Sequence, residues 1–298
     1  MKLKEFLNEK ELISAYDEYG YEEVEERILA KKMGLGFEKI KKLEDGSYEV
    51  WGDFKGDPKD LPIKIKIIHG DFDCSEQDLF YLENIPEIID GDFDCSNNKR
   101  HLTSLEGCPK EVKGNFDCSN NENLTSLEGC PKEVEGDFIC YNNENLTSLE
   151  GSPKSVGGDF DCSFNDLVSL KGISKKIGGN FYCSYNTNLT SLKGAPKIIN
   201  GDFDCSNNNK LTSLKGAPKI INGDFECSNN DKLTSFEGGP EIVNGNFKFY
   251  RNSELTSLKG FPKIVKGHCL CRGNKKQFTK EEIKAVCDVG IDIVVFKK

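Results

Sequence analysis

A segment of about 22 residues, within the range of known repeat proteins, recurs through most of this chain. One clear copy is GDFDCSNNNKLTSLKGAPKIIN, at residues 201–222 of the 298. The copies begin at ten glycines that are almost evenly spaced: Gly70, Gly91, Gly114, Gly136, Gly158, Gly179, Gly201, Gly223, Gly245 and Gly267. A constant period of this size predicts a solenoid, in which each copy forms one coil and packs on its two neighbours. Ten coils about 4.8 Å apart would form a rod roughly 45 Å long.

Each copy can be interpreted as one coil. The phenylalanine and the cysteine of Gly-Asp-Phe-Asp-Cys-Ser are two residues apart, so on a strand both side chains point into the core. Two leucines three apart, such as Leu211 and Leu214, point inward on the return path, and a Gly-x-Pro turn leads back to the next strand.

An asparagine lies three residues after the cysteine position in nearly every copy. The column comprises Asn98, Asn121, Asn143, Asn165, Asn186, Asn208, Asn230, Asn252 and Asn274. A stacked amide can both donate to and accept from the backbone of the turn, so it pairs groups that would otherwise be buried alone. We therefore interpret this column as structural and not as ligand-binding.

The pattern resembles the leucine-rich repeat family, in particular its short bacterial or phage type with a Leu-x-Ser-Leu-x-x-x-Pro segment. The copy from Phe160 to Leu167 fits Leu-x-Leu-x-x-Asn-x-Leu at every position, with Phe160 and Cys162 in the first two leucine places. The other copies have an extra residue between the asparagine and the leucine. The resemblance implies an α/β solenoid, mainly β, built as a single stack of parallel strands and acting by binding a partner.

Both ends depart from the repeat and are predicted to be caps, because an open solenoid end would expose an apolar cross-section. Apolar residues at helical spacing predict two N-terminal helices: Leu3, Phe6, Leu7, Ile13 and Tyr16, then Tyr21, Val24 and Ile28. Thr279-Lys-Glu-Glu282 is a capping box that predicts a short helix, followed by a strand over 291–296. The predicted boundaries are a cap at 1–50, a solenoid at 51–274 and a cap at 275–298.

Eight of the thirteen cysteines occupy the same place in successive copies: Cys74, Cys95, Cys118, Cys140, Cys162, Cys183, Cys205 and Cys227. Phe249 takes this place in the ninth copy, which indicates packing of small apolar side chains and not thiol chemistry. Without an N-terminal signal segment, we expect reduced thiols and a cytoplasmic location. His268, Cys269, Cys271 and Cys287 are a possible zinc set, but Cys269 and Cys271 stand at core positions, so no metal site is predicted.

The residues that flank each core phenylalanine form two polar columns on the exposed side of the strand. The first column is Asp71, Asp92, Asn115, Asp137, Asp159, Asn180, Asp202, Asp224, Asn246 and His268. The second is Asp73, Asp94, Asp117, Ile139, Asp161, Tyr182, Asp204, Glu226, Lys248 and Leu270. Twelve carboxylates on one face are expected to repel one another and to weaken the fold. Two hypotheses remain open: a duplicated surface that keeps the protein soluble, or a docking face for a cationic partner.

Two groups of residues interrupt these columns and are the predicted binding positions. In the fourth to sixth copies, large side chains replace Asp, Ser and Asn: Ile139, Tyr141, Phe164, Tyr182 and Tyr185. Near the C-terminal end the face becomes basic, through Lys248, Tyr250, Arg251, His268 and Arg272. Aromatic clusters on a polar face are typical of binding surfaces. The acidic residues predicted to surround the aromatic group are Asp137, Asp159, Asp161, Asp202, Asp204, Asp224 and Glu226.

No catalytic constellation and no cofactor motif are found, so we expect a protein-binding module and not an enzyme. The net charge of −10 disfavours nucleic acid as a direct partner and favours a basic protein. The specific version of this hypothesis is an inhibitor of a nucleic-acid-binding enzyme, such as a defence nuclease countered by a phage-encoded acidic mimic. No membrane binding is expected, and a monomer is favoured. The alternatives are a scaffold stabilised by calcium, or a fragment of a secreted effector that lacks its catalytic domain.

Overall fold

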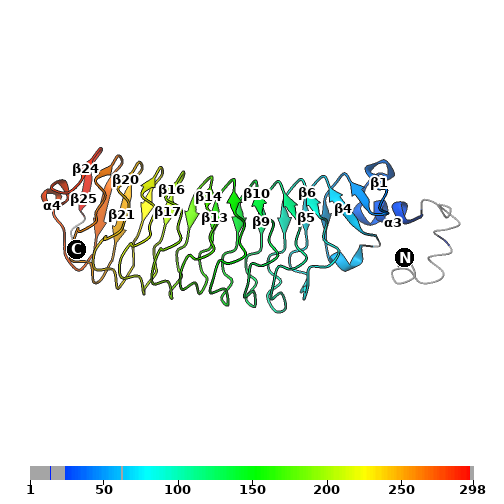
Figure 1. Cartoon of the computed structure of the whole chain (residues 1–298), viewed down its shortest axis with the longest axis horizontal. Helices are drawn as coiled ribbons and strands as arrows, with labels where there is room; N and C mark the ends of the chain where they lie inside the picture. Colours follow the sequence, from blue (N-terminus) through cyan, green and yellow to red (C-terminus); the bar gives the residue numbers. More distant parts are fainter. Residues whose placement is uncertain (1–13, 15–23, 62, 296–298) are drawn as a thin grey trace.

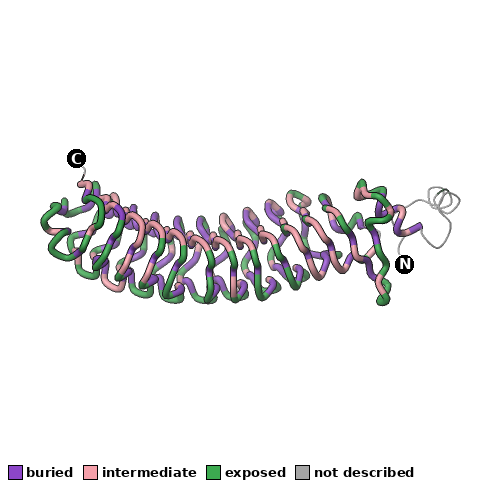
Figure 2. The backbone as a smooth tube through the Cα atoms, turned by 90° about the horizontal axis from the view of Figure 1, so that it is seen from above, coloured by how far each residue is buried: buried purple, intermediate pink, exposed green. Residues whose placement is uncertain are grey.

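The computed structural model describes residues 14, 24–61 and 63–295. The first predicted N-terminal helix lies outside the described residues, apart from residue 14. Two short strands flank each repeat glycine, and each strand pairs in parallel with its equivalent in the next coil. The coils stack into a rod (Figure 1). Seen from above, the rod curves gently along its length (Figure 2). The prediction of a solenoid with one coil per repeat is therefore confirmed, as a mainly β parallel solenoid.

Twelve strands form one continuous sheet, here called the long sheet. In spatial order from the C-terminal end, they are β25 (Ile293–Val295), β23 (Cys269–Arg272), β21 (Phe247–Tyr250), β19 (Phe225–Glu226), β17 (Phe203–Asp204), β15 (Phe181–Tyr182), β13 (Phe160–Asp161), β11 (Phe138–Ile139), β9 (Phe116–Asp117), β7 (Phe93–Asp94), β5 (Phe72–Asp73) and β3 (Phe54–Lys55). Phenylalanine pairs with phenylalanine at most steps, so the polar columns are in register as well.

The second strand of each coil contributes to one of two further sheets, which share a side of the rod. The N-terminal side sheet has eight strands: β1 (Ile40–Lys42), β2 (Tyr48–Val50), β4 (Ile65–Ile68), β6 (Ile88–Ile89), β8 (Glu111–Val112), β10 (Glu133–Val134), β12 (Ser155–Val156) and β14 (Lys176–Ile177). The C-terminal side sheet has five: β16 (Ile198–Ile199), β18 (Ile220–Ile221), β20 (Ile242–Val243), β22 (Ile264–Val265) and β24 (Asp288–Val289). Parallel strands thus line two sides of each coil.

The core is a set of columns that run the length of the rod. Phenylalanine rings from consecutive coils are in contact, with centroids 4.7 to 6.2 Å apart; most are stacked, as between Phe54 and Phe72 and between Phe72 and Phe93. The cysteine column and the paired leucines lie beside them with no exposed surface, as at Cys162, Leu167 and Leu170. The predicted inward positions are therefore confirmed, and each coil buries its apolar side chains against both neighbours.

The column of asparagines that follows the cysteines is buried throughout, as predicted. The Asn121 N–H donates to Asn143 Oδ1 at 2.8 Å, across the gap between two coils. Asn143 Nδ2 donates to the carbonyls of Cys118 at 3.2 Å and of Cys140 at 2.9 Å, one in the preceding coil and one in its own. The amide therefore satisfies three backbone groups that the turn would otherwise leave buried and unpaired.

The two ends of the rod are closed differently. At the N-terminal end, α3 (Val24–Met33) and the short helices η1 (Phe37–Lys39) and η2 (Pro58–Asp60) accompany an antiparallel pair, β1 and β2. Residues 40–42, which were expected to belong to a helical cap, thus form a strand at the edge of the N-terminal side sheet. Trp51, the residue after β2, stacks on His69 with ring centroids 4.8 Å apart and is 36% exposed.

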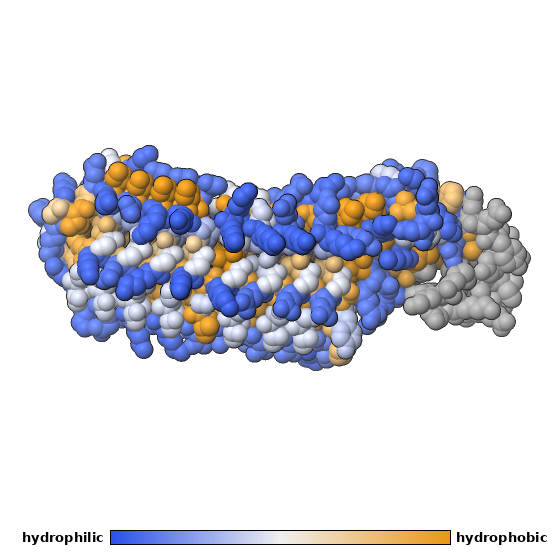
Figure 3. All heavy atoms as spheres, in the orientation of Figure 1, coloured by the Kyte–Doolittle hydropathy of each residue, from blue (hydrophilic) through white to orange (hydrophobic). Residues whose placement is uncertain are grey.

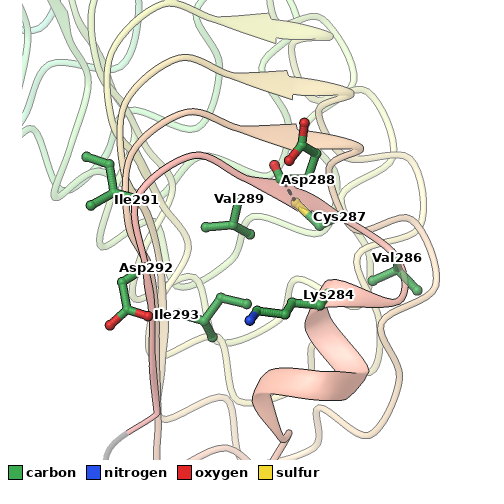
Figure 4. A pocket seen from close by; sticks show the side chains of 8 residues that line it. All are labelled: Lys284, Val286, Cys287, Asp288, Val289, Ile291, Asp292 and Ile293. Carbon is green, nitrogen blue, oxygen red and sulfur yellow. Dashed lines mark hydrogen bonds between the residues drawn. The ribbon is translucent and has the colours of Figure 1, made fainter.

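At the C-terminal end, α4 (Lys280–Lys284) begins at the predicted capping box, where Glu282 N–H donates to Thr279 Oγ1 at 3.2 Å. The strands after it, β24 and β25, add one strand to the C-terminal side sheet and one to the long sheet. The last segment is therefore a further coil with α4 inserted. An open depression of about 580 Å³ lies between α4 and these strands, where Lys284 points from α4 toward Ile293 (Figure 4).

The cysteine column should resist a bulky thiol reagent while the protein is folded. Cys162 and Cys183 have no exposed surface, and burial raises the pKa of both thiols well above the ordinary range. A buried thiol with a raised pKa supplies little thiolate, the reactive form. We expect labelling by a disulfide reagent at pH 8 to be slow until denaturant is added, as followed by mass spectrometry. Rapid labelling of either residue in the native protein would show that the core face is misassigned.

Candidate protein-binding face

The first polar column is a ladder of hydrogen bonds between coils. Asp137 Oδ1 accepts from the Asp159 N–H at 2.7 Å, and Asp159 Oδ1 accepts from the Asn180 N–H at 2.7 Å. The same bond joins every coil from Asp53 to His268. Asp and Asn are interchangeable here because both offer Oδ1 as an acceptor. The expectation that this column only weakens the fold is wrong, since each side chain pairs a backbone N–H of the next coil.

An asparagine follows every two aspartates in this column, from Asp71 to Asn246. Each asparagine also donates its side-chain N–H to the aspartate before it, as Asn180 Nδ2 does to Asp159 Oδ2 at 2.9 Å. Asn246 Nδ2 does the same to Asp224 Oδ1 at 3.0 Å. The amide thereby reduces the repulsion between carboxylates that a parallel stack places close together. The repetition of this column thus has a structural cause.

The second polar column makes turns within each coil. Asp161 Oδ1 accepts from the Ser163 N–H at 2.9 Å, and Asp204 Oδ1 accepts from the Ser206 N–H at 2.8 Å. These are Asx turns, which direct the chain out of the strand. Burial raises the pKa of Asp161 and of Asp204 above the usual range, although the hydrogen bonds from serine oppose that shift.

The double substitution Asp161→Asn and Asp204→Asn is expected to raise the Tm at pH 7. Asparagine keeps the Oδ1 acceptor of the turn and removes two carboxylates whose pKa is raised in the folded state. For such a group, stability falls as pH rises from the unfolded pKa through the folded pKa, so the gain should shrink as pH is lowered toward about 4, the ordinary aspartate pKa, where the unfolded state also begins to bind the proton. Thermal unfolding of variant and wild type between pH 4 and 8 measures this difference.

Asp73 in the same column provides the control for this experiment. Its carboxylate lies 2.6 Å from Lys55 Nζ, and its pKa is lowered although burial opposes that shift. Asp73→Asn should therefore not raise the Tm at pH 7. An equal gain in the Asp73 variant and the double variant, or a gain at pH 4 as large as at pH 7, would contradict the explanation by burial.

The positions before the buried asparagines have left-handed backbone, and three of them carry unusual residues. Asparagine, which tolerates this conformation, occupies most of them, as at Asn142 and Asn207, with φ of 55° and 57°. Phe164, Tyr185 and Arg251 adopt the same conformation, with φ of 56°, 56° and 51°. A bulky side chain in this region costs on the order of 1 kcal/mol. Sequence spacing alone did not reveal this strain.

Phe164 and Tyr185 form the exposed part of the predicted aromatic group. Their rings are stacked with centroids 4.2 Å apart and an interplanar angle of 9°. The side chains are 48% and 44% exposed, so the pair presents apolar surface to solvent. Tyr182 is half-buried, between Asp161 and Asp204 in the register of the long sheet.

The other two predicted aromatic-group residues lie toward the N-terminal side. Ile139 is half-buried and is the register partner of Asp161, which separates it from Tyr182. The Tyr141 hydroxyl accepts a hydrogen bond from Asn120 Nδ2 at 3.3 Å. The five residues therefore form a stacked pair with Tyr182 beside it, and a smaller, separate group of Ile139 and Tyr141.

The predicted basic end is only partly cationic. Lys248 Nζ lies 3.1 Å from Asp224 and 3.9 Å from Glu226, so neighbouring carboxylates offset its charge. Arg251 and Arg272 are exposed, and Tyr250 is half-buried, with its backbone N–H donating to Ser228 Oγ. The two arginines are thus the accessible cations of this group.

The described residues contain no group of three or more His, Cys, Asp or Glu side chains arranged to hold a metal ion. None of the described helices has the length and apolar character needed to cross a membrane. Comparison with protein-family profiles, with curated proteins and with solved structures gave no match.

Proposed function

We propose that this chain is a non-enzymatic protein-binding module of the leucine-rich repeat type, and that the long sheet presents its docking face to a basic partner. The observation that carries the proposal is the stacked pair of Phe164 and Tyr185. Both rings stand where other coils have asparagine, in a backbone conformation unfavourable for them, and both stay exposed. Backbone strain that the fold does not require indicates a position with a functional role.

The surroundings of the pair favour a cationic partner. Asp159, Asp161, Asp202 and Asp204 lie close enough to Tyr182 to raise its pKa, a shift to which burial contributes most. Aromatic rings among carboxylates suit arginine and lysine side chains, which stack on the ring and pair with the acid. The specific form of the proposal is an inhibitor that occupies the basic surface of a nucleic-acid-binding enzyme. A phage-encoded inhibitor of a defence nuclease would be one example. Asp137, Asp224 and Glu226 extend the acidic face on both sides.

The proposal is tested with a double substitution to the residues found in other coils, Tyr182→Asp and Tyr185→Asn. Both side chains point away from the core, so the variant should stay folded by circular dichroism, with a lower Tm because the new carboxylate stands between Asp161 and Asp204 in the long sheet. Affinity for a partner isolated with the wild-type protein should fall about 30-fold, or about 2 kcal/mol, mainly through faster dissociation, since desolvated aromatic anchors govern residence time. Surface plasmon resonance at two salt concentrations measures both rates.

Charge reversal at Asp202 is the companion variant and should mainly slow association at low salt. Because this residue also caps a backbone N–H, its Tm must be measured alongside. If the folded Tyr182/Tyr185 variant bound the partner with unchanged affinity, the surface formed by Phe164, Tyr182 and Tyr185 would not be the docking site and the proposal would fail.

A further inference from the structure

Four isoleucines form an apolar row on the outer side of the C-terminal side sheet. Ile198, Ile220, Ile242 and Ile264 are register partners on β16, β18, β20 and β22. Ile198 is 52% and Ile264 is 37% exposed, and the two between them are half-buried. Apolar side chains gather over these strands in the space-filling view (Figure 3). The residue after each isoleucine supplies the core, so the fold does not require the outer row to be apolar.

The same column is polar over much of the N-terminal side sheet, where its residues are Glu111, Glu133, Ser155 and Lys176. Four consecutive coils therefore share an apolar residue at a position where the four coils directly before them have polar ones, although Ile67 and Ile88 occupy the same column nearer the N-terminal end. Contiguous apolar surface of this kind on a soluble protein marks a contact site.

Lysines border one end of the row without ion-pair partners. Lys175, Lys176 and Lys197 are exposed, and none of them forms a salt bridge with any described residue. Some lysines beside earlier coils are paired instead, as Lys110 is with Glu87 at 2.8 Å and Lys113 with Asp90 at 2.6 Å, whereas Lys132 and Lys154 form no salt bridge with a described residue. The charge beside the row is thus available to an acidic partner.

The side sheet is interrupted where these lysines lie. At the next junction, the Lys219 N–H donates to the Lys197 carbonyl at 2.7 Å and the Asn222 N–H to the Ile199 carbonyl at 2.9 Å. Within the described chain, no equivalent bonds join β14 to β16, although the long sheet is continuous there. A shallow depression of about 670 Å³ lies at this break between β14 and β16, and the three lysines and Ile198 are among the residues that line it. The N–H groups of Lys197 and Asn200 therefore have no backbone acceptor in the described chain, and they are donors suited to a carboxylate.

We propose that this surface, the isoleucine row with its lysine-lined break, docks an acidic amphipathic helix of a protein partner. The row spans three strand intervals, about 14 Å. A helix with apolar residues at i, i+3, i+7 and i+10 presents a stripe about 15 Å long, since it rises about 1.5 Å per residue. Acidic residues beside that stripe meet Lys175, Lys176 and Lys197. The chain then has two docking faces of opposite charge, and this second one goes beyond the proposed function.

The test uses the full chain and a short synthetic fluorescent peptide of leucine, glutamate and alanine, with leucine at i, i+3, i+7 and i+10. Fluorescence anisotropy should show saturable binding to the wild-type protein. Ile220→Ser with Ile242→Ser should weaken binding at least tenfold, and so should Lys176→Glu with Lys197→Glu. The matched control is Lys132→Glu with Lys154→Glu, which changes the charge equally at neighbouring coils and should leave binding unchanged. Tm values confirm that each variant is folded.

Any of the following results would overturn the proposal. Absence of binding, equal binding of a peptide with the leucines scrambled, or equal loss in the Lys132/Lys154 control would leave no specific helix site. Binding to vesicles made of equal parts phosphatidylcholine and phosphatidylserine in place of the peptide, lost in the isoleucine variant, would assign the face to a lipid surface. Self-association in analytical ultracentrifugation that is lost in the same variant would assign it to a second copy of this chain.

Discussion

Asn143→Ala is expected to lower the free energy of unfolding by about 3 kcal/mol or more, because each buried polar group left unpaired costs about 1–3 kcal/mol. The substitution removes an acceptor from the Asn121 N–H and a donor from the carbonyls of Cys118 and Cys140. All three groups lie between coils, away from solvent. Because stability in a repeat array depends on contacts between neighbours, the loss should be felt by the coils on both sides. Chemical denaturation followed by circular dichroism measures it.

Asn142→Gly is the matched control. Asn142 precedes the buried residue, is half-buried, and has a φ of 55°, which glycine adopts without strain. Its side chain makes one hydrogen bond, from Nδ2 to Asn120 Oδ1 at 2.7 Å. We expect a loss of no more than about 1 kcal/mol. Equal losses in the two variants would mean that the buried column does not hold the coils together as described.

Phe203→Ala should destabilise the protein by about 3–5 kcal/mol, the usual cost of emptying a buried phenylalanine site. Phe203 has no exposed surface and stacks on Phe181 and Phe225 with ring centroids 5.3 and 5.5 Å away. Neighbouring backbone is held by the inter-coil ladder, so the cavity cannot close by local collapse. Thermal and denaturant unfolding of the variant provide the measurement.

An exposed phenylalanine in the turn after β13 gives the contrast. Phe164→Asn removes a ring that is 48% exposed and restores the residue common at this left-handed position. Relief of backbone strain offsets the loss of stacking on Tyr185, so stability should stay within about 1 kcal/mol of wild type. If Phe164→Asn proved as harmful as Phe203→Ala, the stacked pair would be part of the fold and would lose its value as evidence for binding.

The candidate site was only partly predictable from the sequence. Ile139, Tyr141, Phe164, Tyr182 and Tyr185 were recognisable because they interrupt columns that are otherwise uniform. Their division into a stacked pair with Tyr182 and a separate pair was not, since it depends on side-chain direction within each coil. The isoleucine row was not singled out in the sequence, although the alternation of outward and inward isoleucines, as in Ile198 and Ile199, was a signal that could have revealed it.

The sequence by itself determined the period, the residues that face the core and the parallel stack. A residue repeated at a constant spacing meets its own copy in the next coil, so the Phe, Cys, Leu and Asn columns follow from the period alone. Tertiary structure decided what the polar columns do. Asp137 and Asp159 belong to different coils, and the bond between the side chain of one and the backbone of the other exists only once the coils are stacked. The break between β14 and β16 was decided in the same way, because backbone pairing depends on how closely two coils approach and not on which residues they carry.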